Sequence, residues 1–292
     1  MRSRQEIKAL AKEAIGEQRG KAILIGFMLV LLTTVSVGLD ELARWAAGEW
    51  AYWIVYTIGL LLLYVFGINI AGEYIKIFKH APASVGALFT GLKVNFLRKL
   101  GGMLWMSLWL MIWALPWLIA VVVLVALNIE GVITDGAFIG YFFLTLPLAI
   151  PTIIKGLSYY MMTYILASAF EVKALKSMRL SKRMTKGHKG KLFVMMLSFI
   201  GWVLLASLPA GILAGIGSFF VLDGDATLGS IFMVLGYLLT ALIYILFLSP
   251  YMYTTYAGYY VELRDNAIEE GRITRAELGM EADDGFAFES EA

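Results

Sequence analysis

Six long apolar stretches constrain the fold of this 292-residue chain more than any other feature of its sequence. They cover residues 22–39, 50–72, 101–127, 137–170, 192–222 and 229–260. About 20 apolar residues in a helix cross the hydrocarbon core of a bilayer. A transmembrane barrel would need shorter strands in which polar and apolar residues alternate, and the stretches show no such alternation. The pattern therefore predicts an all-α membrane helix bundle with six transmembrane helices.

The charges between these stretches predict the orientation of the bundle. The linkers after the first, third and fifth stretches are short and acidic, and of the 24 Lys and Arg residues only Arg44 lies in one of them. The N-terminal segment and the other linkers are basic. Because Lys and Arg are retained on the cytoplasmic side, we expect a plasma-membrane protein with both termini in the cytoplasm.

Prolines interrupt the stretches that are longest. Residues 137–170 would extend about 51 Å as one helix, against a hydrocarbon core of about 30 Å. This stretch contains Pro147 and Pro151, the fifth contains Pro209 and the sixth contains Pro250. Since proline removes a backbone donor and kinks a helix, we expect bent helices in these three spans.

The sequence predicts three regions: an N-terminal helix, the membrane domain and a C-terminal tail. Residues 1–20 predict an amphipathic helix, either in the lipid headgroup region or solvated on the way to the first span. Residues 21–261 form the six-span domain, and its halves 21–130 and 131–261 are a candidate three-span repeat. Residues 262–292 hold ten acidic residues against three arginines, which predicts an acidic cytoplasmic tail, largely disordered.

A stripe of cations lies between the fourth and fifth stretches. Its members recur every three or four residues and are Lys173, Lys176, Arg179, Arg183 and Lys186. Such a stripe attracts anionic headgroups by about 1 kcal/mol per charge, although orientation alone also explains it. The sequence has no nucleic-acid-binding module, so we expect anionic membrane lipids as partners and no nucleic acid. The acidic tail is expected to pair with the stripe and mask it.

A candidate polar site within the membrane comprises Lys155, Tyr244 and Tyr251. An ionisable side chain inside a span is costly and often marks a substrate or ion path. The alternative is that Lys155 reaches the headgroups, because it lies about one membrane thickness after Ala137. The tyrosines recur every seven residues with Tyr237, a spacing typical of cavity lining or of helix packing.

Two further patterns predict contacts of the spans. Small residues four apart let another helix approach closely; on the fifth stretch they are Ser207, Gly211 and Gly215. We expect them to pack inside the bundle. Aromatic residues near span ends are typical of the membrane interface. Candidates are Trp45, Trp50 and Trp53 on the outer side and Tyr256, Tyr259 and Tyr260 on the inner side.

Catalytic motifs are absent from the sequence. Cysteine does not occur, and His80 and His188 have no carboxylate at a metal-ligand spacing. Neither the phosphate-binding GxxxxGK[ST] pattern nor GxSxG is present. These absences weigh against an ATPase, a protease and a serine hydrolase. We therefore expect no enzymatic activity, no metal and no cofactor.

Several local motifs resemble those of a known family. They are the segment SKRMTKGHKGKLF at 181–193 with LSFIGW at 197–202, the residues Pro250, Tyr251, Thr254, Thr255, Ala257, Tyr259 and Tyr260, and the opening helix at 4–15. Together they resemble a bacterial multi-span membrane family of unknown function. That family is distantly similar to the membrane region of some glycerophosphodiester phosphodiesterases, whose hydrolase chemistry lies in a separate domain without counterpart here. The resemblance implies a six-span bundle and no activity.

Three functions fit these observations. The first is a non-enzymatic protein that binds or organises lipid-like or amphiphilic molecules, suggested by the basic stripe and the amphipathic N-terminus. The second is a transporter or channel, with Lys155 and the proline-broken spans lining a path. The third is an accessory membrane subunit of an exporter. The ligand and the oligomeric state stay open.

Overall fold

The computed structural model describes residues 2–280, and within this range every regular element is a helix. Six helices or helix runs of this part are long and apolar enough to cross a membrane. They are α2 (Arg19–Ala47), α3 (Glu49–Phe78), α5 (Phe96–Ile129), the run α6–α8 (Asp135–Ser168), α10 (Lys189–Leu222) and the run α11–α12 (Ala226–Glu269). The predicted all-α bundle with six membrane-spanning helices is confirmed, and the protein is a multi-pass membrane protein.

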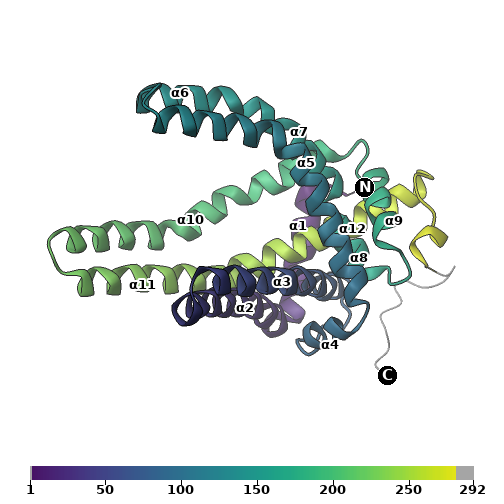
Figure 1. The fold of residues 1–292 in the computed structure, drawn as a ribbon. Coiled ribbons are helices and arrows are strands. Elements are labelled where there is room, and N and C mark those ends of the chain that lie inside the picture. The colour runs from purple at the N-terminus through teal and green to yellow at the C-terminus, as the bar shows by residue number, and fades with distance from the viewer. Residues whose placement is uncertain (1, 281–292) are drawn as a thin grey trace.

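The spans form three hairpins of helices that follow one another in the chain (Figure 1). α2 packs along α3, α5 packs along α6 (Asp135–Thr145), and α10 packs along α11 (Ala226–Ile243). Figure 1 shows the hairpin of α5 and α6 extending to the same side of the molecule as the other two but diverging from them at an angle. Each hairpin turns at a glycine with positive φ, namely Gly48, Gly131 and Gly224, where residues with a Cβ would be strained. We call these three ends the tips.

The opposite ends of the hairpins meet in what we call the base (Figure 1). Its remaining parts are α1 (Arg4–Glu17), α4 (Ala87–Lys93), α8 (Met162–Ser168), α9 (Ala174–Met184) and α12 (Ser249–Glu269). The core lies here: Ile7, Tyr74, Met161, Tyr260 and Leu263 are each at most 1% exposed. By contrast, the most apolar window of α5 contains no buried residue. The apolar surface towards the tips is therefore of the kind that lipid covers.

Two spans are interrupted beside their prolines. In the fourth span, the 3₁₀ segment η1 (Leu146–Ala149) separates α6 from α7 (Ile150–Tyr159), and Pro147 and Pro151 lie at the starts of these two elements. In the sixth span, the π-helical segment η2 (Tyr244–Leu248) precedes α12, and Pro250 is in the first turn of α12. α10 stays one helix with Pro209 inside it.

The apolar face of α1 is buried within the protein. Ile7, Ala11 and Ala14 are 0% exposed, because α1 packs against α12 and α3. A capping box fixes its start: Ser3 Oγ accepts from Glu6 N, and Glu6 Oε2 accepts from Ser3 N at 2.7 Å. Residues 4–17 thus form the predicted amphipathic helix, with its apolar face on the protein. Its level relative to the headgroups stays a prediction.

The segment after α12 folds back on the base. α12 ends at Glu269, and residues 270–280, which we call the strap, contain the short helix η3 (Ala276–Leu278). Ile273 is 1% and Leu278 3% exposed. The prediction of a disordered tail is thus wrong for the strap, because these two apolar side chains find a buried site. The rest of the predicted tail, residues 281–292, lies outside the described residues.

The candidate three-span repeat finds no support in the packing. In residues 21–130 the extensive pairing joins the first and second spans, whereas in residues 131–261 it joins the second and third. A structural repeat would place this pairing at equivalent positions, whichever way the two halves are oriented. The duplication stays a prediction from sequence.

Glycines allow α10 and α11 to approach closely, but not at the predicted positions. A Cβ at Gly217 would lie 2.5 Å from the carbonyl oxygen of Gly229, and one at Gly236 would lie 3.0 Å from that of Pro209. The predicted packing residues are exposed instead: Ser207, Gly211 and Gly215. That prediction is wrong because this stripe faces away from α11, and a Cβ at either of its glycines would meet nothing within 4 Å.

Candidate lipid-binding cleft and basic face

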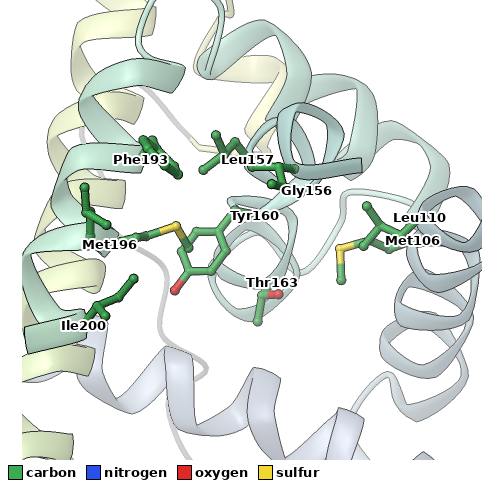
Figure 2. Close-up of a pocket in the computed structure, with 11 residues that line it drawn as sticks. Met106, Leu110, Gly156, Leu157, Tyr160, Thr163, Phe193, Met196 and Ile200 are labelled. Carbon is green, nitrogen blue, oxygen red and sulfur yellow. The ribbon is translucent and has the colours of Figure 1, made fainter. Parts of the chain in front are cut away.

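An apolar cleft of about 430 Å³ lies between α5, α7 and α10 (Figure 2). Its lining comes from Met106 and Leu110 on α5, from Ile153, Gly156, Leu157 and Tyr160 at α7, from Thr163 on α8, and from Phe193, Met196, Leu197 and Ile200 on α10. Residues three or four apart share one face of a helix, so α7 and α10 each present one apolar face. Only Tyr160 and Thr163 bring a hydroxyl group to the lining.

Tyr160 separates the cleft from a core of tyrosines. Figure 2 shows its ring between the side chains of α10 and those of α5. On its other side the ring lies edge-on to Tyr256, with the centroids 5.7 Å apart. Tyr164 stacks on Tyr260 at 5.4 Å, and the hydroxyl oxygens of Tyr260 and Ser168 lie 2.8 Å apart. The cleft therefore ends against the rings of the base core.

These contacts correct the expected aromatic belt on the inner side. Tyr256, Tyr259 and Tyr260 are 7%, 2% and 1% exposed, because α12 continues into the base and other helices surround it. Trp45 and Trp50, at the tip of the first hairpin, are 85% and 65% exposed. Their exposure fits an outer belt, which stays a prediction.

The cations predicted to form a stripe lie on the outer face of α9 and just beyond its two ends. Lys173, Lys176, Arg179, Arg183 and Lys186 are all exposed, whereas Met178, Leu180 and Met184 on the opposite face are buried. Ser181 Oγ donates to the carbonyl oxygen of Ser158 at 2.8 Å, which fixes α9 against α7. We call these five cations the basic face.

The basic face adjoins the cleft through the turn between α9 and α10. Ser158 follows Leu157 of the cleft lining and accepts hydrogen bonds from both Ser181 and Thr185. Lys186 lies in the turn, and Lys189 lies four residues before Phe193 of the lining, on the same side of α10. Along the chain, Lys186 and Lys189 therefore precede the lining residue Phe193 by about one to two helical turns.

The strap covers part of the basic face. Glu277 Oε1 lies 2.6 Å from Arg183 Nη1, and this hydrogen bond lowers the pKa of Glu277 from its ordinary 4.5. Arg272 Nη1 donates to the carbonyl oxygens of Arg183 and Lys186 at 3.0 and 3.2 Å, and also to that of Met184. The expected pairing between the acidic segment and the stripe is confirmed for the strap.

The candidate polar site does not assemble. Lys155 is half-buried on α7, with Nζ 4.3 Å from the ring centroid of Trp113. Tyr244 donates to Tyr253 at 3.4 Å, and the ring of Tyr251 lies edge-on to Phe199. In the described part of the chain no contact joins Lys155 to either tyrosine. The prediction of one shared site is therefore wrong, because each of the three side chains lies against a different aromatic partner.

Sequence reasoning missed two cations that act inside the base. Arg98 donates to the carbonyl oxygens of Leu166, Ala169 and Val172, at 2.7, 3.1 and 2.6 Å, which caps the end of α8. Lys99 is 3% exposed and donates to Asn69 Oδ1 at 2.8 Å. The sequence gives no sign that Arg98 and Lys99 are buried. Both lie in the basic linker before the third apolar stretch, and the orientation of the bundle already explains cations there.

Among residues 2–280, no group of three His, Asp or Glu side chains is placed to hold a metal ion. A family model described as "Protein of unknown function (DUF975)" matches residues 1–267, which runs from α1 to near the end of α12. No curated protein and no solved structure matches the chain. The distant likeness to the membrane region of glycerophosphodiester phosphodiesterases stays a prediction. The match over nearly the whole chain shows that this protein belongs to the DUF975 family, whose function is unknown.

Proposed function

We propose that this protein is a non-enzymatic binder of anionic, lipid-like amphiphiles. The observation that carries the proposal is the position of the cleft, whose apolar walls end beside the cations of the α9–α10 turn. An apolar chain fits the walls, and an anionic headgroup fits the cations. The volume of the cleft, about 430 Å³, lies in the range of about 300–1,000 Å³ found for small-molecule sites.

The lining favours an amphiphile over an ion or a polar solute. A channel or transporter for such a substrate needs polar groups along its path. Of the eleven lining residues only Tyr160 and Thr163 carry a hydroxyl group, and Lys155 is not among them. A second hollow of about 690 Å³ is lined by one face of α11 alone, so it is not enclosed between helices.

The remaining alternative function is that of an accessory membrane subunit of an exporter. Co-purification of an ATPase with this protein would favour it.

We further propose that the base faces the cytoplasm and that the membrane is the plasma membrane. Most Lys and Arg residues belong to the base or its linkers, whereas the tip linkers are acidic. Arg2 and Glu262 form an ion pair of 3.0 Å, so the start of α1 and the end of α12 lie on one side, as an even number of spans requires.

Cysteine labelling tests this orientation without background, because the chain has no cysteine. Lys173→Cys at the base and Asp223→Cys at a tip both replace exposed residues. A membrane-impermeant maleimide added to intact spheroplasts should label Asp223→Cys, and it should label Lys173→Cys only after lysis. Labelling of Lys173→Cys in intact spheroplasts would reverse the proposed orientation.

Filling the cleft should weaken amphiphile binding. A Cβ at Gly156 would have only Leu110 Cδ2, at 4.0 Å, as a neighbour, so Gly156→Leu can place its side chain in the cleft without a clash. Displacing about two methylenes of a bound chain predicts about ten-fold lower affinity. The measurement is titration of the purified protein with a fluorescent fatty acid.

Gly140→Leu on α6 is the matched control, since a Cβ there meets nothing within 4 Å and Gly140 lines neither of the two hollows described. It should bind as the unaltered protein does. Equal affinities for the two leucine variants would show that the chain does not occupy the cleft.

A further inference from the structure

Two lysines from different helices lie on aromatic rings where α5, α7 and α9 pack together. Lys155 Nζ on α7 lies 4.3 Å from the ring centroid of Trp113. Lys182 Nζ on α9 lies 5.0 Å from the ring centroid of Tyr159. Both lysines thus rest on aromatic rings, which support cations through their π faces. Lys155 is not part of the cleft lining, although its neighbour Gly156 is, so this junction lies around α7 from the cleft.

The two positive charges lack a negative partner. Within residues 2–280 neither lysine forms an ion pair with an Asp or Glu. Burial lowers the pKa of Lys182, and the charges of Lys155 and Arg179 lower it further. A lysine inside a span is costly, and a second cation beside it adds repulsion. An anion at the junction would remove both costs.

The surroundings define what kind of anion fits. Ile154, next to Lys155, is 44% exposed, and Leu148, nearer the tip, is 41% exposed. On the other side of the lysines, α9 presents its charged face. Tyr159 is the last residue of α7, and long Lys side chains near the end of a span reach the headgroups. The junction is therefore polar towards the base and apolar towards the tips.

We propose that Lys155 and Lys182 together bind the phosphate of one anionic phospholipid, whose chains lie along the exposed side of α7. The site rests on the proposed function for its ligand class, but it is separate from the cleft. It gives Lys155 a role at the headgroup level instead of on a path through the membrane. Trp113 and Tyr159 hold the two ammonium groups in place.

The test compares two variants with the same change of charge. The double variant Lys155→Gln with Lys182→Gln removes the site, whereas Lys173→Gln with Lys176→Gln removes two exposed cations of the basic face. Native mass spectrometry of the full-length protein, titrated with phosphatidylglycerol or phosphatidylcholine, counts bound lipids. We expect one tightly held phosphatidylglycerol, bound about thirty-fold more weakly by the first variant. The second variant should retain it.

Two additional measurements distinguish a specific phospholipid site from misfolding and from general phosphate binding. Lys155→Arg with Lys182→Arg keeps the charges, so retained binding there shows that the glutamine variant lost charge and not its fold. Inorganic phosphate added at millimolar concentration should not displace the lipid. Displacement by phosphate alone, equal binding of the two lipids, or equal loss in both glutamine variants would each overturn the proposal.

Failure of the phospholipid site at the junction can be distinguished from failure of amphiphile binding in the cleft. Gly156→Leu should leave the tightly held phosphatidylglycerol in place, because its side chain enters the cleft and not the junction. If Gly156→Leu weakens fatty-acid binding while the lysine variant keeps its lipid, only the phospholipid site at the junction is refuted. If the reverse holds, only the cleft is refuted.

Discussion

Releasing the strap should raise the affinity of the protein for anionic lipid about ten-fold. The double variant Arg272→Ala with Glu277→Gln removes one positive and one negative charge, so the net charge of the protein is unchanged. It breaks the ion pair of Glu277 with Arg183 and the hydrogen bonds of Arg272 to the end of α9. Arg183, and Lys176 whose charge acts on Glu277, would then face the headgroups unmasked. Two cations at about 1 kcal/mol each set the upper limit, about thirty-fold.

The measurement is partitioning of spin-labelled phosphatidylglycerol against phosphatidylcholine at the protein surface in reconstituted vesicles. The control is Arg4→Ala with Glu13→Gln, which makes the same pair of charge changes at exposed positions of α1. It should leave the preference within about two-fold of the unaltered protein, and raised salt should reduce every preference. An unchanged preference after release of the strap would show that the strap does not mask the basic face.

The pair of Glu277 and Arg183 also has a defined dependence on pH. Because its hydrogen bond to Arg183 lowers the pKa of Glu277, the pair contributes its full stability above the ordinary value of 4.5. That contribution is lost as the pH falls through the lowered pKa. Acidification should therefore loosen the strap by the same route as the double variant, and Glu277→Gln should abolish this effect of acid on the lipid preference.

Adding one methyl group at Gly258 should destabilise the base by about 2 kcal/mol or more. Gly258 on α12 is buried against Phe78 of α3, and a Cβ there would lie 2.6 Å from Phe78 Cζ. The ring cannot retreat freely, because Phe78 is itself only 8% exposed. α12 and α3 would have to move apart, at the point where the base core joins the first and third hairpins.

The matched variant is Gly16→Ala, which should change the free energy of unfolding in the opposite direction from Gly258→Ala. Gly16 is exposed on α1 and a Cβ there meets nothing within 4 Å. The better helix propensity of alanine should therefore stabilise the protein by up to about 1 kcal/mol. Unfolding of both variants in mixed detergent micelles, followed by near-ultraviolet circular dichroism, gives the two free energies. A stabilising Gly258→Ala would refute the close packing of α12 on α3.

The spans could be predicted from sequence because hydropathy over about 20 residues depends only on local composition. Packing partners could not, since they depend on which face of a helix meets another. Ser207, Gly211 and Gly215 have the right spacing, but Gly217 lies on the face that meets α11. Likewise, Tyr260 at the end of an apolar stretch is typical of an interface until other helices bury it.

The candidate sites likewise divide into a part that follows from local sequence and a part that depends on which helices pack together. The basic face could be predicted, because charges at spacings of three and four must share one side of α9. The cleft could not, because its apolar lining has the same composition as surfaces that lipid covers. For Lys155, chain length left the headgroup level as one of two alternatives, and the nearness of Lys182 on α9 supports it. No sequence pattern connects these two lysines, which are 27 positions apart.

The division of the molecule into hairpins and base sets an order of events during synthesis. Each hairpin joins neighbouring helices, so it can form as soon as its second helix leaves the ribosome. α1 precedes all three hairpins in the chain and packs on both α3 and α12. Its contact with α3 can form once the first hairpin exists, but α12 ends only at Glu269, and the contact of Arg2 with Glu262 spans 260 positions. The seat of α1 in the base is therefore completed only after the third hairpin has been made.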